Sequence, residues 1–264
     1  MSNSPPEIVS FGHEDFWPKA YKEYADVFHA ISRLVTLANE ALDAADRKRS
    51  DELGLSVIGL VRMTGSAMND VMILCGNGSG IGAMKIVRGM FETSLLAEYL
   101  RRNPSDVSDY VDFGPVLAWR RLQTLKGQKR PSMAPEMVKQ LQDEYANVKA
   151  RFTTNGKVRH NWTTKSLREM AQEVGQSESY DFIYGVACSL HHANFEGLMG
   201  SFEMKDGKFE MSAPPSFAWT AAALIAAHEF FLLALDTLND CLKLGFDAQL
   251  QTAHDGFNAL WQGK

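Results

Sequence analysis

The stretch AMKIVRGMFETSLLAEYLRR, residues 83–102, is apolar on nearly every side when it is wound as an α-helix. A helix of this kind is buried, because none of its faces is suited to contact with water. We therefore expect it to lie at the centre of an all-α protein, with the other helices packed around it.

Arg88 and Glu92 interrupt this apolar stretch, four residues apart, on the side that also carries Phe91, Leu95 and Tyr99. Both charges are therefore expected to point into the protein. An Arg that precedes a Glu by four residues is the weaker orientation for stabilising an isolated helix, and burying the pair costs desolvation free energy. The pair is therefore either a device that fixes core packing or part of a functional site.

Further amphipathic stretches lie on both sides of this helix. Apolar residues recur every three or four positions over residues 18–46, 53–75, 104–126, 135–152, 165–174, 180–197, 217–244 and 247–261. Together with the central stretch they predict a multi-helix bundle of about eight to nine helices. We expect a disordered lead-in over residues 1–14 and a single helical domain over residues 15–264.

One segment departs from the helical pattern, near residues 202–211. Apolar and polar residues alternate there on both sides of Asp206-Gly207, which is a strong signal for a β-hairpin. The hairpin directly follows the two adjacent histidines His191 and His192, so it could fold over them as a lid.

The stretch YDFIYGVACSLHHANFEG, residues 180–197, gathers histidines, a serine, a cysteine and carboxylates. Read as one helix, it places Ser189, His192 and Glu196 on one side, which we take as the side for chemistry. His191 falls on the side of Tyr180 and Tyr184 and is expected to be core.

A second titratable pair, His228-Glu229, interrupts the apolar run AAALIAAHEFFLLAL near the C-terminus. We expect a polar pocket lined by Arg88, Glu92, His192 and His228. Its catalytic residues would be His192, Glu92, Ser189 and Glu196, and its ligand-binding residues Arg88, Tyr184, His228 and Glu229. Arginine binds phosphate in a bidentate manner and histidine acts as a general acid or base, so the pocket is interpreted as binding or hydrolysing a phosphate-bearing small molecule or nucleotide.

The chain resembles a bacterial family of all-helical proteins known as domain of unknown function 5677. The resemblance covers roughly residues 50–240 and lies in Arg88-x-x-x-Glu92, in Trp162 before a short capped helix, and in Tyr180-x-x-x-Tyr184-x-x-x-x-Ser189-x-x-His192. It implies a helical bundle in which Arg88, Glu92, Tyr184, Ser189 and His192 are the positions of interest, and it implies no known reaction.

Other functions remain open at this stage. The polar residues could form a satisfied core network in a non-catalytic helical interaction module. A helical ribonuclease of a defence system would need a histidine four to six residues after the arginine on one helix, and Arg88 has none there. The spacing His192-x-x-x-Glu196 places two metal ligands on one helical face, but no Glu-x-x-His pairs accompany it. We assign no metal, and the cofactor is unknown.

Two further segments have an alternative reading. Gly78-x-Gly80-x-x-Ala83 is similar to a dinucleotide-binding loop, but it lacks the flanking strands, so a flexible connection between helices is favoured. Basic and aromatic residues mix over residues 149–168, as in a surface that grips nucleic acid. We favour a solvated loop there, anchored to the core by Trp162.

Net charge, cysteine content and apolar run lengths indicate the compartment and the kinds of partner. The net charge of -5 argues against a protein whose whole surface binds nucleic acid, although a local basic patch stays possible. Three widely spaced cysteines are typical of a reducing compartment. No signal sequence is evident over residues 1–10, and the apolar run over residues 221–235 is too short to span a membrane. We expect a cytoplasmic protein without a membrane partner, and the apolar helices favour a homodimer.

Overall fold

The computed structural model describes residues 12–48, 50–125, 134–192, 195–211 and 215–261, without the side chains of Glu196, Glu203 and Lys205. The helices are η1 (Glu14–Phe16), α1 (Trp17–Asp46), α2 (Glu52–Gly76), α3 (Gly80–Arg102), η2 (Pro104–Asp106), α4 (Val107–Asp112), α5 (Gly114–Leu125), α6 (Pro135–Lys149), α7 (Leu167–Glu173), α8 (Ser177–Ser179), the π-helical turn η3 (Tyr180–Tyr184), α9 (Gly185–His191), α10 (Phe195–Met199), α11 (Thr220–Leu242) and α12 (Asp247–Trp261). The strands are β1 (Thr153–Thr154), β2 (Lys157–Val158), β3 (Phe202–Lys205) and β4 (Lys208–Met211). The predicted all-α class with one hairpin near residues 202–211 is confirmed.

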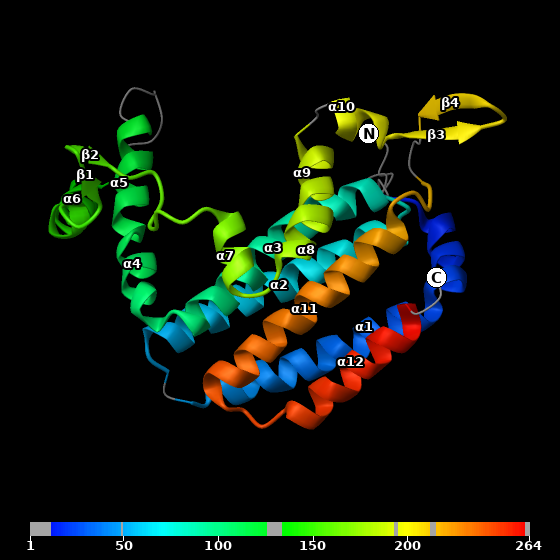
Figure 1. The fold of residues 1–264 in the computed structure, drawn as a ribbon, viewed down its shortest axis with the longest axis horizontal. Helices are drawn as coiled ribbons and strands as arrows, with labels where there is room; N and C mark the ends of the chain where they lie inside the picture. The colour runs from blue at the N-terminus through cyan, green and yellow to red at the C-terminus, as the bar shows by residue number, and fades with distance from the viewer. Residues whose placement is uncertain (1–11, 49, 126–133, 193–194, 212–214, 262–264) are drawn as a thin grey trace, which may run out of the picture.

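Helices α2, α3 and α11 pack against one another and form the centre of the fold. Figure 1 shows α1 and α12 on one side of α11, whereas α7, α8 and α9 lie along α3 on the other. The expectation that residues 83–102 form the central helix is confirmed, because α3 contacts α2, α11, α7 and α9.

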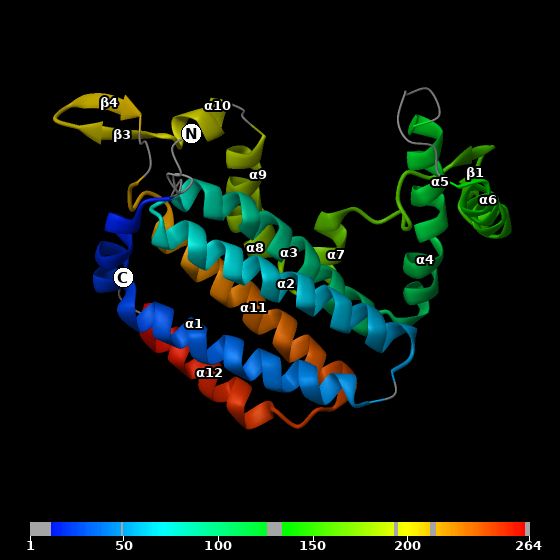
Figure 2. The ribbon, with the colours of Figure 1, turned by 180° about the vertical axis from the view of Figure 1, so that it is seen from behind.

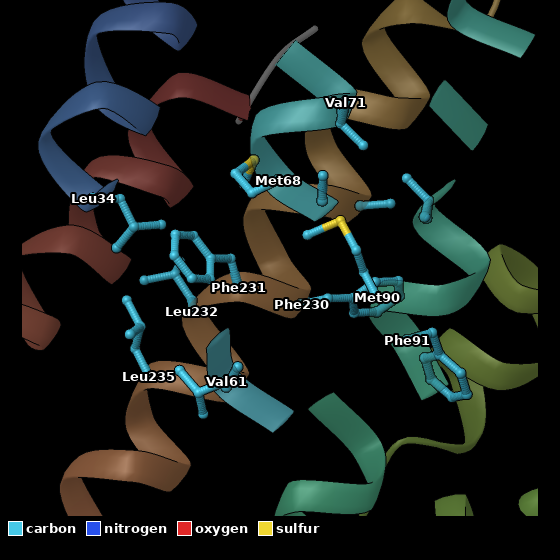
Figure 3. Packing of buried hydrophobic residues seen from close by; sticks show 14 of the residues in the cluster. Leu34, Val61, Met68, Val71, Met90, Phe91, Phe230, Phe231, Leu232 and Leu235 are labelled. Atoms are coloured by element: carbon cyan, nitrogen blue, oxygen red, sulfur yellow. The ribbon is translucent and has the colours of Figure 1, made fainter. Parts of the chain in front are cut away.

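The core is built from large apolar side chains that these helices direct toward one another. In Figure 3, Met90 and Phe91 of α3 approach Phe230 of α11, and Met68 of α2 lies nearby. The rings of Phe91 and Phe230 meet edge to face at 5.2 Å. Burying each side chain of this size contributes about 1.5–3 kcal/mol, so the three central helices carry much of the stability.

The glycine-rich link between α2 and α3 is a close-packed junction rather than the expected flexible connection. A Cβ atom on Gly80 would lie 2.0 Å from the carbonyl oxygen of Ala218, just before α11. Gly78 has a positive φ of 68° and its carbonyl oxygen accepts a hydrogen bond from Ser216. These glycines therefore serve close backbone packing.

The N-terminal segment, residues 1–14, was expected to be a disordered lead-in. The short helix η1 begins within this segment, at Glu14. Residues 1–11 lie outside the described residues.

Helices α4, α5 and α6 extend to one side of the central helices (Figure 1) and enclose a small core of Phe113, Val116 and Phe152. Trp162 meets Tyr99 and Tyr110 edge on, at 6.1 and 5.6 Å. The expected role of Trp162 as an anchor to the core is thereby confirmed. The neighbouring strands β1 and β2 were not predicted.

The hairpin of β3 and β4 turns at Asp206 and Gly207, which both have positive φ. Figure 2 shows it projecting beyond the ends of the helices, to one side of α9 and α10. The expectation that it covers the His191–His192 segment as a lid is therefore wrong.

Helices α2 and α11 are both long and apolar enough to cross a membrane, judged by length and composition. This differs from the prediction that no apolar run suffices. The apolar window is 67% buried inside the protein in α11 and 39% buried in α2. Two such helices are weak support for a membrane, because the core helices of soluble proteins can have the same length and composition. The cytoplasmic location and the single-domain organisation stay predictions.

Candidate functional site

Arg88 and Glu92 of α3 meet Tyr184 at the end of η3. The Arg88 Nη2 atom lies 2.9 Å from the Glu92 carboxylate, and the Tyr184 hydroxyl donates a 2.9 Å hydrogen bond to the same carboxylate. Arg88 also reaches the Tyr184 oxygen at 3.5 Å, and the Cys188 side chain of α9 interacts with both groups. We call Arg88, Glu92, Tyr184 and Cys188 the Arg88 cluster.

Aromatic stacking holds Tyr184 in this position. The rings of Tyr180 and Tyr184 stack at 5.2 Å with an angle of 24° between their planes, and Phe91 lies 5.1 Å from Tyr184. The π-helical turn η3 makes this contact possible, since it changes the helical register between α8 and α9. π-helical turns are frequent at functional sites, so the turn is consistent with a functional site in this region.

The Arg88 cluster is charged but internally neutralised. The hydrogen bond to Tyr184, opposed by burial and aided by Cys188 and Glu92, raises the pKa of Arg88, while burial raises the pKa of Tyr184. Arg88 therefore remains a cation, paired with Glu92. The side chains of Arg88 and Glu92 are 27% and 39% exposed, so solvent or a ligand can reach the pair, although the Arg88 Nε is buried without a hydrogen-bond partner.

Glu229 lies at the other end of the tyrosine stack. Its carboxylate accepts a 3.0 Å hydrogen bond from the Ser179 hydroxyl. Burial raises the pKa of Glu229, and the bond from Ser179 partly offsets this effect. Glu229 therefore fixes α8 on α11 and contacts neither Arg88 nor Glu92.

The stretch over residues 180–197 is not the single helix that the sequence predicted. Helix α9 ends at His191, His192 lies in a turn, and α10 begins at Phe195. Ser189 is buried, whereas His192 is exposed and its ring meets that of His191 at 5.1 Å. Ser189, His192 and Glu196 thus do not form one continuous helical face, and the Glu196 side chain lies outside the described part of the chain. His191, expected in the core, is exposed.

His228 lies apart from the Arg88 cluster. It faces α1 and α12, where its ring meets Phe257 edge on at 4.9 Å. The expected pocket formed jointly by Arg88, Glu92, His192 and His228 is therefore not assembled. The reason is geometric: one helical step of about 100° separates His228 from Glu229 on α11, so they face different neighbouring helices.

Several cations of the basic segment over residues 149–168 are held in ion pairs. Arg151 pairs with Asp109 and Asp112, and Lys165 pairs with Glu173 at 2.6 Å. These contacts tie the segment to α4 and α7. Among the described residues, no group of three or more His, Cys, Asp or Glu side chains is placed to hold a metal ion.

Sequence reasoning missed two polar groups. Cys188 belongs to the Arg88 cluster, and its position four residues after Tyr184 was the signal. Glu98 is buried and accepts hydrogen bonds from Arg101, Arg102 and Thr237. In the sequence it stands near two arginines at the end of the central helix, which is a common place for exposed charges.

The Arg88 cluster and the π-helical turn both lie within residues that match a known family. Residues 56–209 match the Family of unknown function (DUF5677). The chain belongs to this family. No curated protein and no solved structure matches it significantly. The DUF5677 segment spans α2 to the start of β4 and so includes Arg88, Glu92 and Tyr184, whereas α1, α11 and α12 lie outside it.

Proposed function

We propose that this DUF5677 protein is a non-catalytic helical interaction module whose partner is a second copy of the same chain. The observation that carries the proposal is a set of large apolar side chains that stay exposed on η3, α10 and the hairpin: Phe182, Phe195, Leu198, Met199, Met204, Phe209 and Met211. Phe182 and Phe195 are 74% and 78% exposed. Single exposed apolar residues are common, but a large group within a short span of the chain, here residues 182–211, is typical of an interaction surface.

The exposed area suits a dimer. A large side chain presents roughly 150–250 Å² when fully exposed, so these seven residues expose on the order of 600–1,100 Å². The largest apolar patch of a typical monomer is about 300–600 Å², and a stable interface buries about 800 Å² on each partner. The total apolar area that these separate side chains expose is thus comparable to one side of a homodimer interface.

One face of the hairpin is apolar and is left exposed by the part of the chain that the structure describes. The strand register pairs Phe202 with Met211 and Met204 with Phe209, and directly paired residues share a face of the sheet. Met204, Phe209 and Met211 are all exposed. An isolated two-stranded hairpin is only marginally stable in water, so a partner that covers this face would stabilise it.

An apolar groove on the same protein is complementary to this face. Met84 of α3, Phe182 and Val186 near α9, and Ala222 and Ile225 of α11 line a groove of about 290 Å³. The groove and the hairpin are both apolar and both belong to one chain. In a twofold dimer the hairpin of each copy fills the groove of the other, so one contact is made twice.

The oligomeric state tests the proposal. Sedimentation equilibrium should give twice the chain mass of 29.4 kDa for the wild type, and Met204→Asp or Phe209→Asp should give the monomer mass. Met137→Asp on α6 is the matched control, since Met137 is 54% exposed and Met204 63%. A monomeric wild type, or an equal effect of the Met137 variant, would show that the proposal is wrong.

A mixed sample tests the hairpin-in-groove contact itself. Chains carrying Met204→Cys are mixed with chains carrying Ala222→Cys and treated with a short bis-maleimide. We expect the yield of cross-linked heterodimer to be well above the yield from a control mixture of Met137→Cys and Ala222→Cys chains. The native cysteines contribute equally to both mixtures. Equal yields in the two mixtures would place the dimer contact elsewhere.

The second candidate function is binding of a phosphate-bearing small molecule at the Arg88 cluster. It is favoured by the partial exposure of Arg88 and by its Nε, which has no hydrogen-bond partner. Glu92 opposes it, because the carboxylate already neutralises the guanidinium. No histidine is among the partners of Arg88 in the described residues, so hydrolysis and ribonuclease activity receive no support from the geometry.

Ligand-induced thermal shifts test this second candidate. Inorganic phosphate, AMP and ATP should raise the Tm of the wild type, and Arg88→Lys should reduce the shift, since Lys cannot bind phosphate in a bidentate manner. Arg62→Lys is the control, because Arg62 forms a similar ion pair with Asp46 on the surface. Identical shifts in the wild type and the Arg88 variant would rule out this site.

A further inference from the structure

We infer that the cavity between α1, α11 and α12 binds a small aromatic carboxylate that carries a second hydrogen-bonding group. This cavity has a volume of about 290 Å³ and is lined by the apolar residues Ala30, Leu34, Leu37 and Ala253, by Gly256, and by the polar residues Arg33, His228, Gln249 and Thr252. It lies outside the DUF5677 segment and away from the Arg88 cluster, so it is independent of the function proposed above.

Small residues on α12 create the space. Ala253 and Gly256 line the cavity together with Leu34 and Leu37 of α1, and a Cβ atom on Gly256 would meet no other atom within 4 Å. Figure 1 shows α1 and α12 side by side along α11. Arg33, Gln249, Thr252 and Gly256 are exposed, so the cavity opens to solvent and a ligand can enter it.

His228 provides the polar group inside the cavity. Its side chain is 1% exposed, and its buried Nδ1 has no hydrogen-bond partner. Buried polar groups of native proteins are nearly always hydrogen-bonded, and an apolar residue would fill this position of α11 at lower cost. Burial, aided by the charge of His254, lowers the pKa of His228 to about 4. The ring is therefore neutral near pH 7 and offers one donor and one acceptor to a ligand.

The shape and lining indicate the body of the ligand. A dry cavity of about 150 Å³ accommodates one benzene molecule, so this cavity has room for a substituted ring. The walls contributed by Leu34, Leu37 and Ala253 favour an apolar body, and the edge of Phe257 is already in contact with the His228 ring.

Arg33 indicates the charge of the ligand. It is exposed on α1, lines the cavity and makes no ion pair with any residue that the structure describes. A guanidinium at the edge of an apolar cavity is suited to a carboxylate. A ligand with a carboxylate toward Arg33 and a hydroxyl toward His228 would satisfy both groups.

Isothermal titration with 4-hydroxybenzoate, benzoate and phenol tests the inference. For the wild type we expect 4-hydroxybenzoate to bind most tightly. Arg33→Gln should weaken 4-hydroxybenzoate and benzoate about 5- to 10-fold and leave phenol unchanged, because a charged hydrogen bond near the surface is lost. His228→Phe should bring the affinity for 4-hydroxybenzoate to that for benzoate.

Gly256→Leu should abolish the binding of all three compounds, because the introduced leucine side chain would occupy the cavity. The matched control is Gly59→Leu, a helical glycine of α2 whose Cβ position is also open, and Arg121→Gln is the control for Arg33. Arg33 is a surface residue, so its variant keeps the test valid even if the His228 variant fails to fold. The inference is overturned if the wild type shows no saturable binding, if phenol binds as tightly as 4-hydroxybenzoate, or if Gly256→Leu binds like wild type.

Discussion

Replacing Glu98 with Gln should destabilise the protein more than any substitution of a surface carboxylate. Glu98 is buried near the end of α3 and accepts hydrogen bonds at both oxygens. Oε1 lies 2.8 Å from Arg101 Nη2 and 2.6 Å from Arg102 Nε, whereas Oε2 lies 2.7 Å from Arg101 Nε and 3.1 Å from the Thr237 hydroxyl. Because Thr237 belongs to α11, the carboxylate joins two of the three central helices.

The magnitude follows from which bonds the amide keeps. Glutamine retains one acceptor oxygen and directs an NH₂ group at donors, so about two charge-assisted bonds are lost, each contributing about 1.5–3 kcal/mol. Arg101 and Arg102 are partly exposed, and water recovers part of the loss. The net cost should be about 2–4 kcal/mol, a little below the roughly 3–5 kcal/mol for removing one partner of a fully buried pair.

Urea unfolding at pH 7 measures this cost, with Asp46→Asn as the control. Asp46 pairs with Arg62 and both are half exposed, so its substitution should cost about 0–1 kcal/mol. Burial raises the pKa of Glu98, but the hydrogen bonds and charges of Arg101 and Arg102 lower it by more than burial raises it. The pKa of Glu98 in the folded protein therefore lies below the ordinary value of 4.5. Its stabilisation is therefore present above pH 4.5 and lost as pH falls through the folded-state pKa. A cost equal to that of Asp46→Asn, or a difference that persists at low pH, would refute the reasoning.

Three further outcomes follow from single positions. Gly197→Ala should abolish self-association while far-UV circular dichroism stays unchanged, because the new Cβ would lie 2.0 Å from the carbonyl oxygen of Ser189 and push α10 off α9; a dimeric variant would contradict the proposed interface. Cys75 is fully buried, and burial raises its pKa to about 12, so mass spectrometry should find iodoacetamide on the half-buried Cys188 before Cys75. His228 is neutral in the folded state down to about pH 4, whereas the same histidine in the unfolded chain becomes protonated near pH 6.5. The free energy of unfolding should therefore fall as the pH drops from about 6.5 to 4, by on the order of 3 kcal/mol. His228→Phe should flatten that pH dependence, and an unchanged slope would exclude His228 as its cause.

Local patterns in the sequence were sufficient for the main elements of the fold. The apolar periodicity of residues 83–102 predicted α3, and Asp206-Gly207 between alternating residues predicted the hairpin. Asn155-Gly156 carries the same kind of turn signal and both residues have positive φ, yet β1 and β2 were missed. Each of these strands has two residues, which is too short for alternation to be visible.

Long-range packing explains what the sequence could not reveal about the site. The π-helical turn arises where Tyr180 and Tyr184 stack against Phe91, about 90 positions earlier in the chain, and no local pattern encodes that contact. The sequence likewise predicted that His228 and Glu229 of α11 belong to one pocket. It could not show that the first faces α12 and the second α8.

The Arg88 cluster and the proposed interface share one structural element, so they should be coupled. Tyr184 is held by Arg88 and Glu92, while Phe182 and Ile183 of the same π-helical turn line the groove that receives the hairpin. An anion that draws Arg88 away from Glu92 would release Tyr184 and with it one wall of the groove. Since coupling between two binding events is reciprocal, phosphate should then weaken self-association and self-association should weaken phosphate binding by the same factor. If phosphate instead leaves the dimer dissociation constant unchanged, the Arg88 pair only fixes η3 on α3, which is the structural role that its neutralised charge already favours.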